Sequence, residues 1–280
     1  MKAETYLSII ALLLFTAYSF SEEGAAQASV QQQTTSTLGW SAEETVLAKA
    51  FAIRAAKLEK ATGISLGPEW NPRVDIEWSI ATESGERNIS ARYDPEKQMF
   101  LFPMSIIAEM TIRHDKIPLS QLDPIVAADD ALFNIIADHE IGHAIADVVS
   151  RRLHAGPFYT VERFNNQTKE GQWGLNIVSE GIGTYFERLL HDKNDVLSPF
   201  ALPASFEQLQ TYNFDIIAFQ GGYWLVEEIL DKYRERGLGW LVSHPFIPGE
   251  NMRQDAIRYR ESALTALAAT PCRPGLLKKY

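Results

Sequence analysis

One segment limits the possible folds of this chain more than any other: His139-Glu140-Ile141-Gly142-His143, within a long stretch of helical spacing. Four residues advance an α-helix by about 400°, so the two imidazoles leave one face about one turn apart. At this spacing two neutral imidazole nitrogens can bind one Zn²⁺ ion, while Glu140 reaches a water on the metal without being a ligand. The segment therefore predicts a helix that carries two metal ligands and a general base.

The composition restricts which other side chains can complete such a site. Cys272 is the single cysteine in 280 residues, which excludes an intramolecular disulfide framework and a cysteine-rich zinc or iron–sulfur site. A metal must therefore be held by His, Asp or Glu. The formal net charge is -10, from 26 basic and 36 acidic side chains. This acidic balance argues against a surface that coats nucleic acid.

The first 40 residues are expected to lie outside the folded domain. Lys2 precedes an apolar run over residues 6–20, and about 15 residues are too few to span a bilayer of ~30 Å. Ala26-Gln27-Ala28 fits the small-x-small pattern of a signal cleavage site. Residues 1–28 are interpreted as a signal peptide, with a buried helix as the alternative, and the polar residues 29–40 as a flexible lead-in. This predicts a secreted or periplasmic protein with no stable membrane span after cleavage.

Residues 41–280 are predicted to form one α+β domain, in which a small antiparallel sheet precedes a mainly helical region. Ser41-x-x-Glu44 is a capping box that begins a helix ending near Gly63. Three segments have the pattern of strands, and the turn signal 94–97 joins the second to the third; they are residues 74–80, 89–93 and 98–102.

Three long helices are predicted after the sheet. The first begins at Pro124, with Asp123 as its N-cap, and continues to about Leu153. The second covers residues 174–190. The third covers residues 214–236, with Gly221-Gly222 inside it as a possible break, and the C-terminal residues are expected to form a loop.

A catalytic zinc site also requires a third protein ligand and an open position. The histidine of the longer HExxHxxGxxH pattern is absent, because residue 149 is Val. Glu180 is the best remaining candidate, and a surface carboxylate is the alternative interpretation. Gly181 and Gly183 follow it, and glycine costs ~1 kcal/mol relative to Ala inside a helix. These glycines, together with Gly142, would let the two helices approach closely.

The segments HEIGHAIAD (139–147) and IVSEGIGTYFE (177–187) resemble the active-site helices of the gluzincin metallopeptidases, which include thermolysin-like and aminopeptidase-like enzymes. The resemblance covers residues 124–190 and, loosely, 205–240. It implies a zincin-like metallopeptidase domain in which His139, His143 and Glu180 bind zinc and Glu140 is the catalytic base. The expected partner is a peptide or protein substrate.

The expected reaction is hydrolysis of a peptide bond. Zn²⁺ lowers the pKa of its bound water to ~7 and polarises the scissile carbonyl. Glu140 would take the water proton and pass it to the leaving amine. An oxyanion donor is expected from a later helix: Tyr223 is the first choice, Tyr212 the second and His244 the third, with core packing as the alternative for each.

Two further expectations concern the surroundings of the site. Asp147 and Thr184 are candidates to orient the histidines through their other ring nitrogens, with a solvated surface position as the alternative for Asp147. The strand 98–102 is expected at the sheet edge beside the cleft, where a peptide can add as an extra strand. An ordinary buried strand is the alternative there.

Two other functional hypotheses remain open. The chain is alternatively a non-catalytic peptide- or metal-binding protein on a zincin scaffold, or a zinc hydrolase acting on a non-peptide amide. The intact Glu140 favours an enzyme, since a binding protein does not need the base. Charged residues on the motif helix disfavour an intramembrane protease; they are Asp129, Asp130, Asp138, Asp147, Arg151 and Arg152.

Overall fold

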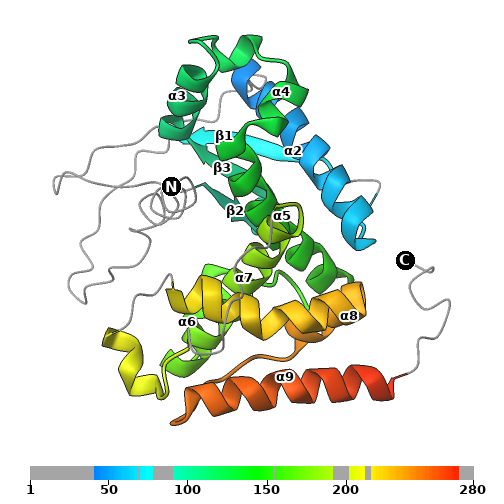
Figure 1. Cartoon of the computed structure of the whole chain (residues 1–280), viewed down its shortest axis with the longest axis vertical. Helices are drawn as coiled ribbons and strands as arrows, with labels where there is room; N and C mark the ends of the chain where they lie inside the picture. Colours follow the sequence, from blue (N-terminus) through cyan, green and yellow to red (C-terminus); the bar gives the residue numbers. More distant parts are fainter. Residues whose placement is uncertain are drawn as a thin grey trace.

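The computed structural model describes residues 41–67, 70–77, 91–153, 155–191, 202–211 and 216–270. These residues form a mixed α+β fold that is mostly helical, with a three-stranded sheet. The sheet lies at one end with α2, α3 and α4, while α9 lies at the other end, and α5 runs from the sheet toward α7 (Figure 1). The predicted signal peptide, residues 1–28, and lead-in, residues 29–40, lie outside the described residues.

Helix α2 (Ala42–Thr62) begins at the predicted capping box and packs on the sheet. Ser41 Oγ accepts a hydrogen bond from the amide of Glu44 at 3.1 Å, and the Glu44 carboxylate accepts one from the amide of Ser41 at 2.6 Å. The helix ends at Gly63, whose φ of 72° is a left-handed conformation that glycine adopts without steric cost. Phe51 stacks on Phe100 of the sheet with ring centroids 4.1 Å apart. Helix α2 therefore covers one face of the sheet.

The sheet contains β1 (Arg73–Glu77), β3 (Met99–Pro103) and β2 (Arg92–Asp94), in that order. Strands β2 and β3 form the predicted antiparallel hairpin, in whose turn Asp94 Oδ1 accepts hydrogen bonds from two backbone amides. Strand β1 pairs with β3 in parallel, so the prediction of an antiparallel sheet is wrong for this pair. Residues 78–98 separate the two strands, which is enough for the connection of about a dozen residues that a parallel pair needs.

Strand β3 is the central strand, and all five of its residues are buried. Its predicted place at the sheet edge is therefore wrong, and the alternative of an ordinary buried strand is confirmed. The continuous apolar run Met99-Phe100-Leu101-Phe102 is typical of a strand covered on both faces. Strand β2 is the edge strand that contacts α5 instead.

The predicted helix from Pro124 to Leu153 is two helices, α4 (Pro124–Asp129) and α5 (Ala131–Arg152), preceded by α3 (Met104–Arg113). Asp130 separates them, because its ψ of 131° is not helical. Its carboxylate accepts hydrogen bonds from the amides of Leu132 and Phe133 at 2.9 and 3.0 Å. Asp130 thus caps α5, the helix that carries the histidine motif.

The second half of the described chain is helical. It contains α6 (Val161–Asn165), α7 (Lys169–Leu189), a π-helical turn (Ile216–Gly221), α8 (Gly222–Ser243) and α9 (Met252–Ala269), with 3-10 turns at Leu119–Gln121 and Phe206–Thr211. The predicted break at Gly221-Gly222 is the point where the π-helical turn becomes α8. The sequence analysis did not predict helix α9. Two of its four buried residues are alanines, so large apolar side chains mark its buried face only weakly. Within the described ranges, no helix is both long and apolar enough to cross a membrane.

A buried ion pair joins α2 to α5. Arg54 Nε donates to Asp138 Oδ1 at 2.8 Å, and its terminal nitrogen Nη2 donates to Oδ2. Both residues are buried, with exposed fractions of 5% for Arg54 and 0% for Asp138. His191 Nε2 lies 3.3 Å from the same carboxylate. A planar guanidinium fork matches a carboxylate with two parallel hydrogen bonds, so this pair fixes α2 relative to the motif helix.

Replacing Arg54 with Leu is expected to lower the free energy of unfolding by about 3–5 kcal/mol, because the buried carboxylate of Asp138 would lose its guanidinium partner. Urea denaturation followed by circular dichroism measures the change. Lys57→Leu on the same helix is the matched control, since the Lys57–Asp129 pair is exposed and such pairs contribute at most about 1 kcal/mol. Equal losses in the two variants would contradict the expectation.

Candidate metal centre

The packing of α5 against α7 depends on glycine. A Cβ added at Gly142 would lie 3.1 Å from the Cα of Gly183, and one added at Gly183 would lie 2.6 Å from Cε1 and Nε2 of His139. The predicted close approach is confirmed for these two glycines. Gly181 contacts α8 instead, because its Cβ would lie 2.4 Å from the carbonyl of Gly222.

The three predicted ligands converge at this contact. His139 Nε2 lies 3.1 Å from His143 Nε2 and 3.1 Å from Glu180 Oε2, and His143 Nε2 lies 3.8 Å from the same oxygen. One ligand atom from each residue lies within 4.8 Å of the others. Two nitrogens bound to one tetrahedral zinc at 2.0–2.1 Å are about 3.3 Å apart. The group therefore has a donor set and a spacing that could hold a metal ion.

The second nitrogen of each imidazole also has a partner. His139 Nδ1 lies 3.2 Å from Glu187 Oε2, and His143 Nδ1 lies 3.3 Å from Ser179 Oγ. Partners of this kind fix the ring orientation and the tautomer of a metal-binding histidine. They turn both Nε2 atoms toward Glu180.

These partners differ from the predicted ones. Thr184 is buried, and its hydroxyl has no hydrogen-bond partner among the described residues. Glu187 takes the expected role at His139. It lies seven residues, or about two turns, after Glu180 on α7, and this spacing was the sequence signal that could have indicated it. Phe219 of the π-helical turn was also missed. Its ring centroid lies 5.4 Å from that of His139.

Asp147 attaches the β2–β3 hairpin to α5 and orients neither histidine. Its Oδ2 accepts hydrogen bonds from Tyr93 Oη at 3.1 Å and Arg151 Nε at 2.9 Å, and its Oδ1 accepts one from the Phe158 amide at 3.3 Å. Arg151 also donates to the carbonyl of Pro95 in the hairpin turn. Asp147 is only 1% exposed, so a solvated surface position is wrong as well.

Glu140 lies between the two histidines on α5 and is 7% exposed. Burial raises the pKa of its carboxyl group to about 7. A general base is most effective when its pKa lies near the working pH. Glu140 Oε2 accepts a hydrogen bond from the backbone amide of Tyr93 at 2.7 Å, which joins the edge strand to the motif helix.

The ligand side chains strongly perturb one another. Burial acts to lower the pKa of His139, but its hydrogen bonds to Glu180 and Glu187 and the nearby carboxylate charges together outweigh burial and raise that pKa well above the usual range. Burial lowers the pKa of His143 to about 4. Burial acts to raise the pKa of Glu180, but the hydrogen bond from His139 and the charges of the two histidines together outweigh burial and lower that pKa. The centre thus favours one positive charge beside Glu180, and binding of a metal ion would displace the proton that supplies it.

Two of the predicted oxyanion donors, Tyr223 and His244, have other contacts in the structure. Tyr223 is buried on α8, where its hydroxyl donates to Glu227 at 2.6 Å and its ring centroid lies 5.0 Å from Cζ of Arg188. His244, at the end of α8, lines a separate pocket. Tyr212 lies outside the described residues. The oxyanion donor stays a prediction.

Comparisons with known proteins found no match: no family model, no curated protein and no solved structure matches this chain. Features of the chain's own residues support a metal centre. These are the spacing of the histidine motif, the convergence of Glu180 on it, and the partners that orient each imidazole.

Gly183→Ala is expected to weaken zinc binding roughly tenfold or more, because the added Cβ would displace the ring of His139 and a displaced ligand binds more weakly. Competition with a chromophoric zinc chelator measures the affinity. Gly239→Ala on α8 is the control, since its Cβ would lie 3.4 Å from the nearest side chain, an ordinary contact. An unchanged affinity in the Gly183 variant would show that the ring does not need this space.

Glu187→Gln is expected to reduce zinc affinity about 10–100-fold while the fold persists, because loss of a carboxylate that orients a metal-binding histidine has effects of this size. The amide occupies nearly the same volume, so any loss reflects charge and hydrogen bonding. Glu162→Gln, at an exposed position on α6, is the control. Equal zinc affinities in both variants would exclude the role of Glu187.

Proposed function

We propose that this chain is a zinc-dependent metallopeptidase with a zincin-like domain, secreted or periplasmic, that hydrolyses peptide bonds. The observation that carries the proposal is the convergence of His139, His143 and Glu180 beside the buried carboxylate of Glu140. Two imidazoles and one carboxylate are a ligand set of catalytic zinc sites that leave a position open for water or substrate.

The donor chemistry fits zinc. His139 and His143 would contribute Nε2 atoms whose partner nitrogens are oriented by Glu187 and Ser179, and Glu180 would contribute a carboxylate oxygen. Zinc held there supplies an acidified water and polarises a carbonyl group.

Glu140 has the properties required for proton transfer. With a pKa of about 7, its carboxyl group can accept a proton and release it near neutral pH. The Tyr93 amide donates a hydrogen bond to Oε2, and Oε1 accepts none from the described residues. We assign proton transfer from water to the leaving amine to Glu140.

A peptide substrate is favoured by the position of β2. This edge strand contacts α5, and the Tyr93 amide points toward Glu140 rather than toward β3. An edge strand can pair with an extended peptide through main-chain hydrogen bonds, and a peptide at Tyr93 would take over the amide that bonds to Glu140. A peptide added along β2 would therefore pass close to the proposed base.

Glu140→Gln is expected to retain about one zinc per chain and to lose peptide hydrolysis by at least about 100-fold, the usual contribution of a general base. His139→Ala is expected to lose the metal as well. Digestion of a peptide library, followed by mass spectrometry, measures cleavage, and elemental analysis measures zinc. Glu162→Gln is expected to match the wild type.

Two outcomes would overturn parts of this proposal. A wild-type protein that binds zinc but cleaves no peptide would be a binding protein or a hydrolase of a non-peptide amide. Full zinc occupancy in Glu180→Ala would remove Glu180 as a ligand.

A further inference from the structure

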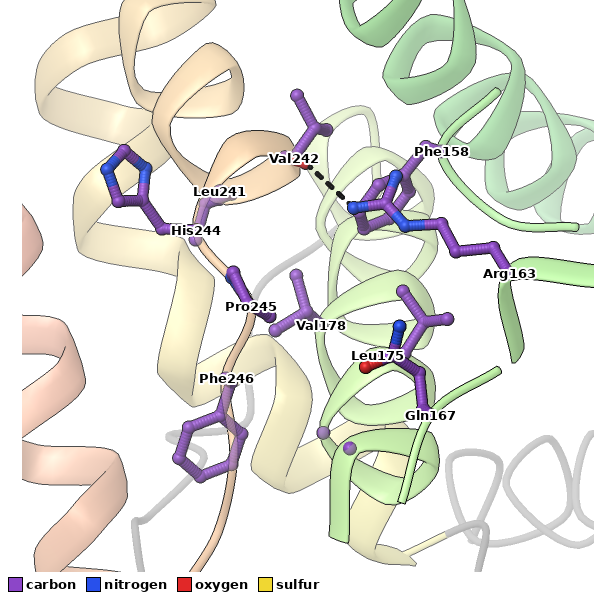
Figure 2. A pocket seen from close by; sticks show the side chains of 12 residues that line it. Phe158, Arg163, Gln167, Leu175, Val178, Leu241, Val242, His244, Pro245 and Phe246 are labelled. Carbon is purple, nitrogen blue, oxygen red and sulfur yellow. Dashed lines mark hydrogen bonds between the residues drawn. The ribbon is translucent and has the colours of Figure 1, made fainter. Parts of the chain in front are cut away.

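A pocket on the other side of α7 is separate from the metal ligands. It encloses about 70 Å³ between α6 and α7 on one side and the connection from α8 to α9 on the other (Figure 2). Val178 lines it, two residues before Glu180. Two residues advance a helix by about 200°, so Val178 and Glu180 lie on opposite faces of α7.

Most of the pocket wall is apolar. The α8–α9 connection lies directly against α7 at Gly174, where an added Cβ would be 1.7 Å from the carbonyl oxygen of Phe246. This contact brings the connection against α7, so that it forms one wall of the pocket. The apolar side chains that line the pocket are Phe158, Leu175, Val178, Leu241, Val242, Pro245 and Phe246.

Arg163 is the cation of the pocket. Figure 2 shows its side chain reaching across from α6 toward the backbone of Val242. Its two described hydrogen bonds go to the carbonyls of Pro157 and Val242, both at 3.4 Å, beyond the usual range of 2.7–3.2 Å. Its Cζ also lies 5.5 Å from the ring centroid of Phe158. Arg163 thus has only neutral, distant partners among these contacts.

Arg163 differs in its partners from some, but not all, of the other described arginines, since Arg236 also donates to backbone carbonyls. The formal net charge of the chain is -10. Arg54 and Arg260 each form an ion pair with a carboxylate. Arg163 forms no ion pair with the described residues. Burial also lowers the pKa of its guanidinium group, because part of its hydration is lost. A partly desolvated guanidinium without an anion would gain from a carboxylate that satisfies its planar fork.

We propose that this pocket binds a carboxylate carried on a short apolar chain, with Arg163 as its counter-ion. An apolar wall with a small number of polar side chains, here Arg163, Gln167 and His244, is typical of a small-molecule site. One water requires roughly 10–15 Å³ of such space, so about 70 Å³ accommodates a few non-hydrogen atoms. The ligand is either a free short-chain acid or the C-terminal residue of a peptide, since both present this chemistry.

The first test uses the full-length wild-type chain and a series of small probes. Isothermal titration calorimetry or saturation-transfer NMR would compare butyrate, acetate, butyramide and N-acetylvaline. Butyrate is expected to bind at least fivefold more tightly than acetate, because it also fills the apolar space. Butyramide has the same shape without the charge and is expected to bind at least tenfold more weakly than butyrate.

The second test changes the cation. Arg163→Gln is expected to weaken butyrate binding at least tenfold, and Arg163→Lys to lose less, since lysine keeps the charge without the planar fork. Arg113→Gln is the matched control, because Arg113 lies on α3 and pairs with Glu109. Melting temperatures identify any variant that fails to fold. The comparison of probes on the wild-type protein tests the proposal without any variant.

Each outcome decides the proposal or its ligand source. Tighter binding of N-acetylvaline identifies a peptide C-terminus, and tighter binding of butyrate identifies a free acid. The proposal is overturned if neither carboxylate binds the wild type, if butyramide binds as well as butyrate, or if a folded Arg163→Gln protein binds butyrate unchanged.

Discussion

The candidate centre depends on the contact between α5 and α7 at Gly142 and Gly183. Glycine costs about 1 kcal/mol relative to Ala inside a helix, so the packing of the two helices must compensate for it. A side chain at Gly183 would occupy the space of the His139 ring. Glu180 lies three residues before Gly183, and this contact places its Oε2 3.1 Å from His139 Nε2. Ligand convergence is therefore a consequence of helix packing.

Helix α7 makes similar close contacts on several sides. Gly174 meets the α8–α9 connection, Gly181 meets α8, and Gly183 meets the motif helix. Because α7 has neighbours on several sides, its different faces line different sites. One face carries Glu180 toward the histidines, and the opposite face carries Val178 toward the pocket of Arg163.

The sequence predicted those features that depend on interactions between residues close together in the chain. The capping box at Ser41, the C-cap at Gly63 and the spacing of the histidines each depend on a few neighbouring residues. The parallel pairing of β1 with β3 depends on residues far apart in the chain, and the break at Asp130 lies within a continuous helical pattern. The orienting role of Glu187 depends on the rotation of α7 against α5, which spacing alone does not provide.

The edge strand and the proposed base are fixed to each other at two points. Tyr93 donates its amide to Glu140 and its hydroxyl to Asp147, which lies seven residues, or about two turns, further along α5. Burial is the largest influence on Glu140 and raises the pKa of its carboxyl group, while the charge of His139 and, to a smaller extent, the Tyr93 amide lower that pKa. A shift of the hairpin would change the burial of Glu140 and this hydrogen bond together. The position of β2 therefore influences the proton affinity of Glu140, so the strand edge that would pair with a peptide also tunes the group proposed to act on it.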